Sequence, residues 1–289
     1  MKKKLLIILT LLILILTTGC FKRDIMEDIN IYTTIYPIEY VTGRLYGDSS
    51  SIKSIYPRGV YSPDYKLTNK QLKDYSRADL FIYNGSSNEK EYATYMLNKN
   101  NNLKIIDASY SLEKVYHRSD IWLNPSNILM IAQNIRNELS DYITNKYIKE
   151  DIEQKYSDFK VDITKLETEM KLAADNSNNN KFISADGSLK FLEKYGFEVI
   201  SLTEDGKENE TNIETAINLL SDNTLSTVFV TEETKNSSQV NKIKQSIPDV
   251  TISQINLLEN LTEENVKNGE DYLSIMYSNL DLIKQETYK

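Results

Sequence analysis

The stretch that decides the fold is YIKEDIEQKYSDFKVDITKLETEMKLAADN, which runs from Tyr147 to Asn176 without a glycine or a proline. Its apolar residues, among them Ile152 and Phe159, recur at helical spacing and mark one stripe. The pattern predicts a single helix over residues 147–176. A coiled coil is the alternative interpretation, but one stripe of this length with no matching partner segment favours a long helix that connects two parts of the chain.

Strands and helices alternate on the N-terminal side of this helix. The segment from Ile29 to Ile35 has a strand-like pattern, and the chain then turns at Pro37 into a predicted helix. Further predicted strands lie in SIKSIYPRG (51–59), ADLFIYNG (78–85) and LKIIDAS (103–109), and further helices follow the predicted N-caps Thr68 and Asn124. This alternation predicts an α/β lobe with a mainly parallel sheet over residues 29–146.

The composition changes sharply at DNSNNNK, residues 175–181, and the alternation restarts after it. Strand patterns in KFISA, FEVISL, STVFVTE and VTISQI alternate with helical patterns, the last of which is EDYLSIMYSNLDLIKQE. The segment 177–289 is therefore predicted to form a second α/β lobe. Two such lobes joined by one long helix suggest a ligand cleft between them, because open parallel sheets bind ligands beyond the carboxyl ends of their strands.

The N-terminus has the pattern of a targeting signal. MKKK precedes an apolar run from Leu5 to Leu16 that is short for a membrane span of roughly 20 residues, and this pattern is typical of a secretory signal. The run ends in LTTGC, which resembles the lipobox of bacterial lipoproteins. We therefore expect residues 1–20 to form a signal peptide with a lipidated Cys20, and residues 21–28 to form a tether. A plain secretory signal or an uncleaved anchor is the alternative.

Composition narrows the class of protein further. The net charge of −8 lacks the concentrated basic footprint of a nucleic-acid-binding protein. Cys20 is the only cysteine, which excludes a disulfide framework and a thiolate metal cluster. The only histidine, His117, leaves little acid–base chemistry near neutral pH, and no nucleophile–base pair or phosphate-binding loop is recognisable. We therefore expect a binding protein and not an enzyme.

Several longer segments resemble a known family. They are, in order, TTIYPIEYVTGRLYGD, IYPRGVYSPDYKLTNKQLKDYSRADLFIYNG, SDIWLNPSNILMIAQNI, ISADGSLKFLEKYG and GEDYLSIMYSNLDLI. In order and spacing these segments resemble the zinc- and manganese-binding lipoproteins that serve bacterial metal ABC transporters. The resemblance covers nearly all of the chain after the leader. It implies two α/β lobes joined by a rigid helix, and a metal ion held in the cleft between them.

The resemblance also implies where metal ligands lie, and this sequence lacks the family's histidines there. The family's second ligand is the histidine of a His-x-Trp-Leu motif, and Asp120 stands at that position. The first is the histidine of a Gly-x-x-Pro-His-[Asp/Glu]-Tyr motif, where Pro63 stands here, followed by Asp64. The third falls on Asp186 in SADG, or on Ala185 in an ungapped alignment.

The fourth family ligand is an aspartate after the last strand, and the segment INLLEN offers Asn256 or Glu259 for it. His117, three residues before Asp120, is either a further ligand or a surface residue. The implied ligand set is Asp120, Asp186, Glu259 and Asp64. Zinc prefers nitrogen and sulfur ligands, whereas oxygen-rich sites suit harder cations such as manganese. If the site holds one divalent metal ion, a harder cation than zinc is favoured.

Each of these acids also has an ordinary structural interpretation. Asp120 is suited to stabilise the turn before the helix at Asn124, and Asp186 is suited to cap the helix that follows it. Trp122, the only tryptophan, is expected to belong to the core beneath the cleft. The joint placement of Asp120 and Asp186 at family ligand positions favours the metal-binding interpretation.

Two functions are therefore expected from the sequence. The first is a monomeric, lipid-anchored solute-binding protein on the outer face of the bacterial cell membrane. It would capture manganese or zinc and deliver the ion to an ABC permease. The second is a degenerate relative without a bound metal, which acts as a surface interaction or adhesion protein or binds another solute. The missing histidines favour this second function.

Overall fold

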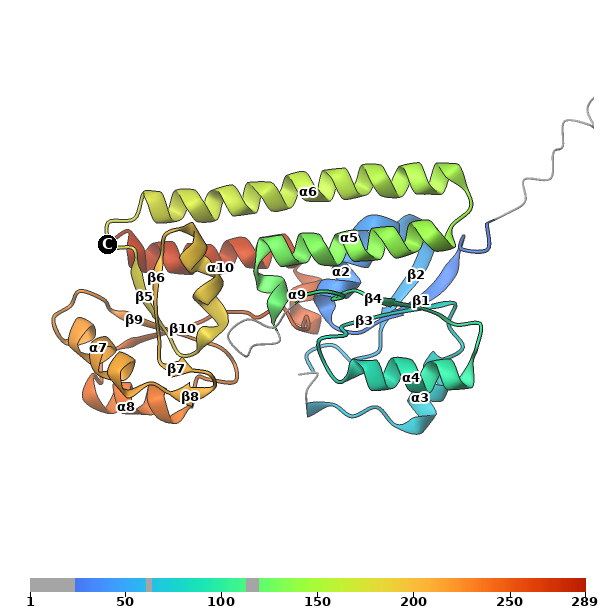
Figure 1. Ribbon diagram of the computed structural model, residues 1–289. Coiled ribbons are helices and arrows are strands. Elements are labelled where there is room, and N and C mark those ends of the chain that lie inside the picture. The colour runs from blue at the N-terminus through green and yellow to red at the C-terminus, as the bar shows by residue number, and fades with distance from the viewer. Residues whose placement is uncertain (1–23, 61–63, 113–119) are drawn as a thin grey trace, which may run out of the picture.

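The protein consists of two α/β lobes under one long helix (Figure 1). The computed structural model describes residues 24–60, 64–112 and 120–289. Helix α6, Lys146–Asp175, runs along one side of the molecule and spans both lobes. This arrangement confirms the predicted fold class of two parallel sheets flanked by helices and connected by a long helix.

The first lobe is built on a four-stranded sheet with the order β2-β1-β3-β4, in which all neighbouring strands are parallel. Helices α2 and α5 lie on the side of this sheet that faces α6, and α3 and α4 lie on the other side (Figure 1). The elements are β1 Ile29–Thr33, α2 Tyr36–Tyr46, β2 Ser50–Ser54, α3 Asn69–Tyr75, β3 Leu80–Tyr83, α4 Glu89–Lys99, β4 Lys104–Asp107, the 3₁₀ turn η3 Ile121–Leu123 and α5 Pro125–Tyr142.

The second lobe repeats this plan with a parallel sheet of order β10-β9-β5-β6. Helices α7 and α8 cover the side that faces away from α6, and α10 lies between the sheet and α6 (Figure 1). The elements are β5 Lys181–Ser184, η4 Gly187–Tyr195, β6 Glu198–Ser201, β7 Thr203–Glu204, β8 Lys207–Glu208, α7 Glu210–Ser221, β9 Thr227–Val230, α8 Ser238–Ser246, β10 Thr251–Gln254, α9 Glu263–Lys267 and α10 Tyr272–Thr287.

Helix α6 forms because its sequence offers one apolar face and no helix breaker. Its 30 residues extend over about 45 Å at 1.5 Å per residue. The predicted stripe is the buried face, and Ile152, Phe159 and Ile163 on it are fully enclosed. The helix packs on α2 and α5 of the first lobe and on α10 of the second, so it is a shared support for both lobes.

A second connection joins the lobes through residues 255–262, which we call the crossing segment. In the crossing segment, the carbonyl oxygen of Glu259 accepts from the Tyr36 N–H (2.8 Å), and that of Leu261 accepts from the Gly59 N–H (2.9 Å). One continuous hydrophobic core extends from the first lobe through α6 into the second. A smaller core lies between the second sheet and the α7–α8 side. The lobes are therefore packed together as well as linked.

Local signals in the sequence account for several helix starts. The side chains of Thr68 and Asn124 accept from backbone N–H groups at the starts of α3 and α5, as predicted. The helix predicted after Asp186 is present, and residues 187–195 adopt its 3₁₀ form. The loop around Gly206 contains the short antiparallel hairpin β7–β8. Among the described helices, none is long and apolar enough to cross a membrane.

Candidate functional site

A pocket of about 200 Å³ lies where the turn before α5 meets the start of η4. The first lobe contributes Asp120 and Ile121, and the second contributes Gly187 and Ser188. The remaining lining residues are Asn124, Asn127, Lys190, Phe191, Glu193 and Lys194. We call this space the junction pocket. It lies between the lobes, where the two-lobe prediction places a ligand.

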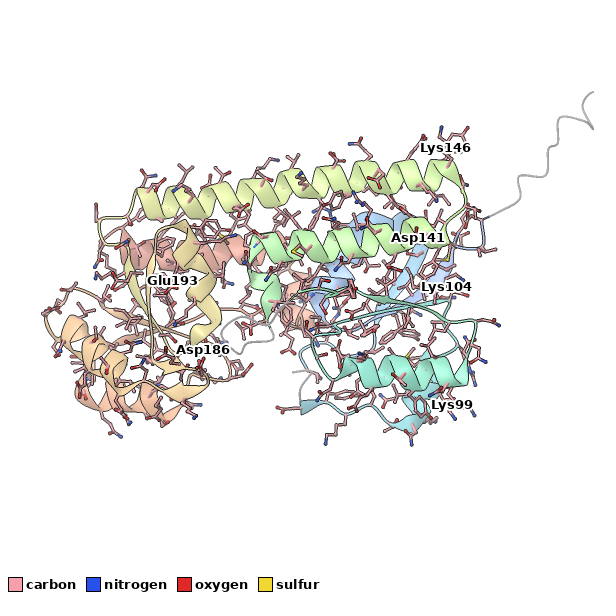
Figure 2. The ribbon with its side chains drawn as sticks, in the orientation of Figure 1. Lys99, Lys104, Asp141, Lys146, Asp186 and Glu193 are labelled. Atoms are coloured by element: carbon pink, nitrogen blue, oxygen red, sulfur yellow. The ribbon has the colours of Figure 1, made fainter. Side chains whose placement is uncertain are left out.

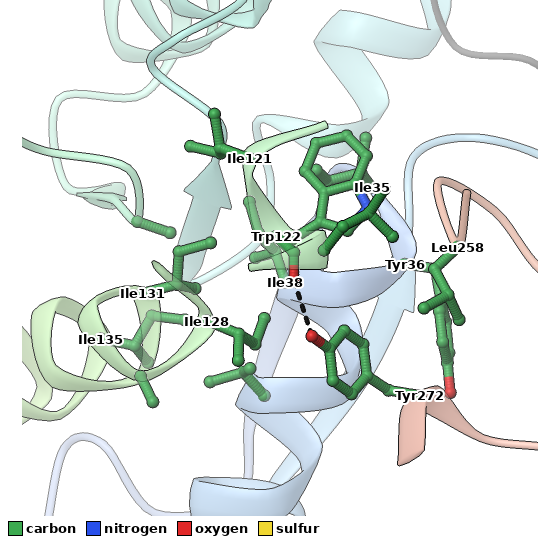
Figure 3. Close-up of a cluster of buried hydrophobic side chains, with 14 of the residues drawn as sticks. Ile35, Tyr36, Ile38, Ile121, Trp122, Ile128, Ile131, Ile135, Leu258 and Tyr272 are labelled. Carbon is green, nitrogen blue, oxygen red and sulfur yellow. Dashed lines mark hydrogen bonds between the residues drawn. The ribbon is translucent and has the colours of Figure 1, made fainter. Parts of the chain in front are cut away.

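Asp120 enters the junction pocket from a turn that Trp122 holds in place. Trp122 is buried, and its indole N–H donates to the carbonyl oxygen of Leu257 in the crossing segment (2.7 Å). The Tyr272 hydroxyl donates to the carbonyl oxygen of Trp122 (2.6 Å), as Figure 3 shows. Trp122 is therefore a core residue, as predicted, and it fixes the turn that carries Asp120. Asp120 itself is only 8% exposed, and its side chain makes no capping bond to η3.

Asp186 stands on the side of the second lobe that faces the first (Figure 2). It is 6% exposed, and its carboxylate accepts from the Ser188 N–H (2.9 Å) at the start of η4. The predicted N-cap role is therefore confirmed. Ser188 lines the junction pocket, whereas Asp186 itself is not among its lining residues. Ala185, the residue of the ungapped alignment, is fully buried and offers only a methyl group.

The two candidates for the fourth ligand differ in what their side chains do. The side-chain oxygen of Asn256 accepts from the Leu258 N–H (2.8 Å). The Asn279 side chain accepts from the Asn256 N–H and donates to the Asn256 carbonyl oxygen. Asn256 thus shapes the crossing segment. Glu259 is half-buried and lies near Tyr56. Burial and the Glu89 carboxylate raise the pKa of Tyr56, and the charge of Glu259 adds to this rise.

The remaining predicted residues are less closely tied to the junction pocket. Asp64 is exposed and is not among the lining residues. Pro63, His117 and Cys20 lie outside the described residues. Over the ranges that the structure describes, no three His, Cys, Asp or Glu side chains form a group that could hold a metal ion. The acids that line the junction pocket are Asp120 and Glu193, and Asp186 caps η4 next to the lining residue Ser188.

The lysines of η4 are site residues that sequence reasoning missed. Lys190 and Lys194 both line the junction pocket. The Lys194 ammonium donates to Asn124 Oδ1 (3.0 Å) and Ser126 Oγ (2.8 Å) at the start of α5, and it pairs with Glu167 of α6 (3.0 Å). In the sequence, their position is what could have indicated a place at the site, because both lysines lie in the predicted helix that directly follows Asp186.

A buried acid of the first lobe, Glu89, was also missed. The Tyr56 hydroxyl donates to Glu89 Oε1 (3.1 Å), and the Asn84 N–H donates to Oε2 (2.9 Å). Burial raises the pKa of Glu89 to about 7, against the effect of these hydrogen bonds, which favour the ionised form. Nothing local distinguishes Glu89 from the exposed acid Glu91 in the same helix, so its burial is visible only in the folded lobe.

Two parallel α/β lobes, a shared long helix and a pocket at the lobe junction are the features of a two-lobed solute-binding protein. Comparison with known sequences identifies the family. The sequence profile of the family described as zinc-uptake complex component A, periplasmic, matches residues 31–286, so the chain belongs to this family. The resemblance found in the sequence is thereby confirmed. The family consists of metal-binding solute-binding proteins of zinc and manganese ABC transporters.

Individual relatives are distant in sequence and close in fold. The zinc-binding lipoprotein AdcA of Streptococcus pneumoniae is 24% identical over 99% of this chain, which spans 61% of the length of AdcA. The manganese ABC transporter substrate-binding lipoprotein PsaA of Streptococcus mitis is 26% identical, with 90% of this chain and 89% of PsaA covered. The crystal structure of the Zn(II)-bound ZnuA-like domain of S. pneumoniae AdcA superposes with a TM-score of 0.73 at 22% identity, covering 91% of this chain and 100% of that domain.

Proposed function

We propose that this protein is an extracytoplasmic solute-binding protein that captures a divalent metal ion and delivers it to an ABC permease. The observation that carries the proposal is the junction pocket, which Asp120 of the first lobe lines together with Gly187 and Ser188, the two residues that follow Asp186 in the second. Family membership supports it, because relatives of this chain are named for zinc binding and manganese transport.

The proposed ligands are the acids that the sequence places at family positions. Asp120 and Asp186 are the principal ligands in this proposal, because both are buried, Asp120 lines the junction pocket, and Asp186 precedes the lining residues Gly187 and Ser188. Glu259 and Asp64 are the further candidates. Carboxylate oxygens favour manganese over zinc, since zinc prefers nitrogen and sulfur ligands. The selectivity we expect for this chain is therefore closer to that of a manganese carrier.

The proposed location and partners rest on the leader and the family. Acyl chains on Cys20 would hold the protein at the outer face of the cell membrane, with residues 21–28 as the tether. The lobes at 29–146 and 177–289, with the linker helix at 147–176, would meet the permease as one monomeric unit. Named lipoproteins among the relatives support this location. We expect no catalytic activity and no nucleic-acid partner.

Metal analysis and calorimetric titration of the purified protein with manganese and zinc test this function. Asp120→Asn and Asp186→Asn remove one charge each, and asparagine is also a good N-cap, so the start of η4 should persist in the second variant. We expect each variant to bind manganese at least about tenfold more weakly, because a ligand charge is lost. Asp141→Asn, an exposed change on α5, is the matched control (Figure 2). If the wild type binds neither metal, the proposal is wrong.

A second function is favoured by one observation. Within the described ranges the acids form no three-residue metal group. A relative that has lost metal binding would keep the fold as a surface interaction or adhesion protein, or would bind another solute in the junction pocket. The same titration separates the two functions, because the degenerate protein gives no heat with either metal and carries none after purification.

A further inference from the structure

The inner part of the proposed tether is fixed to the start of α6. The Asp24 carboxylate is buried, and its Oδ2 accepts from the N–H groups of Thr144 (2.7 Å) and Asn145 (2.6 Å), just before α6 begins. The Thr144 hydroxyl donates to the same oxygen (2.7 Å), and Oδ1 accepts from the Met26 N–H (2.8 Å). Met26 is itself buried in the core. Asp24 is therefore a fixed point of the body, at the end of the long helix where the described chain begins (Figure 1).

The chain between this fixed point and the proposed anchor is short. Only residues 21–23 separate Cys20 from Asp24, and two of them, Lys22 and Arg23, carry positive charge that suits anionic headgroups. The four Cα steps from Cys20 to Asp24 span at most about 14 Å when the chain is fully extended. Acyl chains on Cys20 would lie in the bilayer. The start of α6 would then stay within about 14 Å of the membrane surface.

Two apolar side chains are exposed at this end of the molecule. Ile25 is 70% exposed although its neighbours Asp24 and Met26 are buried, and Tyr147 is 77% exposed in the first turn of α6. Among the exposed large hydrophobic side chains of the described ranges, these two have the highest exposure. The hydrogen bond from the Asn145 N–H to Asp24 joins the two segments that carry them. The fold thus places both side chains beside the short connection to Cys20.

The chemistry of this surface fits the headgroup level of a lipid bilayer. A tyrosine has an apolar ring and a polar hydroxyl, and such side chains gather where lipid meets water. Lys146, beside Tyr147, is exposed and pairs with Glu150 (3.4 Å), so the charge around the two apolar side chains is mixed (Figure 2). Burial of two side chains stabilises a contact only modestly, which is sufficient for a protein that its anchor already holds at the surface.

We propose that the surface formed by residues 24–26 and 144–147, which we call the anchor corner, rests on the lipid bilayer with Ile25 and Tyr147 at headgroup level. This inference rests on the lipid anchor of the proposed function and adds which face of the body touches the membrane. The contact is confined to the anchor corner. Further along α6, exposed charged pairs such as Lys171–Asp175 (3.2 Å) favour water over lipid.

Fluorescence quenching by brominated lipids tests this contact. The chain from Cys20 onward is coupled through its only thiol to a maleimide-headgroup lipid, in phosphatidylcholine–phosphatidylglycerol vesicles with brominated acyl chains. Tyr147→Trp should lose at least about half of its added fluorescence, because its indole enters the interface by roughly 5–10 Å. Leu172→Trp, about 37 Å further along α6, is the matched control and should lose less than about a tenth. Trp122 adds the same buried background to both.

Ile25→Asp, added to Tyr147→Trp, separates contact with lipid from tethering alone. We expect it to lower the quenching at least about twofold, because a carboxylate in place of the isoleucine must stay hydrated. Val161→Asp, a half-exposed position in the middle of α6, is the control and should leave the quenching unchanged. Circular dichroism confirms that each variant is folded.

Two results would overturn the inference. Equal quenching of Tyr147→Trp and Leu172→Trp would show that the body does not rest on the anchor corner. Quenching that does not respond to Ile25→Asp would show that the tether alone holds Tyr147 at the membrane.

Mass spectrometry of Cys20, in the protein isolated from bacterial membranes, tests the anchor of the proposed function separately, since maleimide coupling needs no acylation. An unmodified Cys20 would overturn that anchor together with this inference. An acylated Cys20 without quenching at Tyr147 would overturn this inference alone.

Discussion

Glu89 shows how one buried residue links stability to pH. Its pKa rises from 4.5 to about 7 in the folded protein because burial disfavours its charge. A raised pKa means that the folded state holds the proton more tightly. The stabilisation is therefore complete below about pH 4.5 and is lost as the pH rises through about 7. Converted at 1.36 kcal/mol per pKa unit, the loss is about 3 kcal/mol.

Glu89→Gln should remove this pH dependence. We expect the difference in unfolding free energy between wild type and variant to shift by about 3 kcal/mol between pH 4.5 and pH 7.5, in favour of the variant as the pH rises. Urea unfolding at several pH values measures it. A difference in unfolding free energy that stays the same at every pH is compatible with the prediction. It is expected because the glutamine side chain has one acceptor oxygen for the two groups that donate to the Glu89 carboxylate. Parallel curves over the whole range would contradict the prediction.

Gly85 is a residue at which the space allows no side chain. A Cβ atom at Gly85 would lie 2.0 Å from Oδ2 of Asp107, whose other oxygen accepts from the N–H groups of Gly85 and Ser109. Gly85→Ala must displace this carboxylate and break its hydrogen bonds, which should cost about 1–3 kcal/mol. Gly43→Ala is the control, since no atom lies within 4 Å of its Cβ position and the residue is inside α2. It should be neutral or stabilising by about 0.5–1 kcal/mol in chemical denaturation.

The sequence predicts those residue roles that depend on neighbours along the chain. Thr68, Asn124 and Asp186 all have the cap role that their positions before a helical pattern indicate. The burial of Glu89 depends on Tyr56, which lies 33 residues away, so no local pattern predicts it. All four metal-ligand positions stay predictions. Family spacing alone does not determine the path of the crossing segment, which the fold places against Tyr36 and Trp122.

At the scale of elements, η4 is held by contacts to α5 and α6. Lys194 bonds the start of α5 and pairs with Glu167 of α6, and the Tyr195 hydroxyl donates to the same carboxylate (2.9 Å). The 3₁₀ form of residues 187–195 was not predicted, because their apolar pattern is also compatible with an α-helix. The contacts that hold this segment come from elements distant in sequence.

Lys194→Met should loosen η4 from both helices. Because the pair is about one third exposed, solvent screening limits its contribution, and we expect a loss of about 1 kcal/mol in unfolding free energy. Amide hydrogen exchange within residues 187–195 should increase as well. Lys171→Met breaks an exposed pair within α6 and should change stability by less than about 0.5 kcal/mol. Equal effects of the two substitutions would show that the Lys194 contacts add nothing.

At the scale of the whole molecule, the lobes share one core. The continuous hydrophobic core passes through α6, and the crossing segment is hydrogen-bonded to the first lobe. Trp122 bonds the crossing segment through its indole N–H and α10 through its carbonyl oxygen. The long helix and the alternation of strands and helices were predictable from periodicity. The packing between the lobes was not, because it depends on residues more than 100 positions apart.

We expect the two lobes to unfold in a single cooperative transition. Trp122 is the only tryptophan and lies at the junction, so its fluorescence reports on the contact between the lobes. Far-ultraviolet circular dichroism reports on both lobes together. Because separating the lobes exposes their shared core, the two signals should give the same midpoint in urea. A fluorescence transition that precedes the loss of helix would show that the junction opens first.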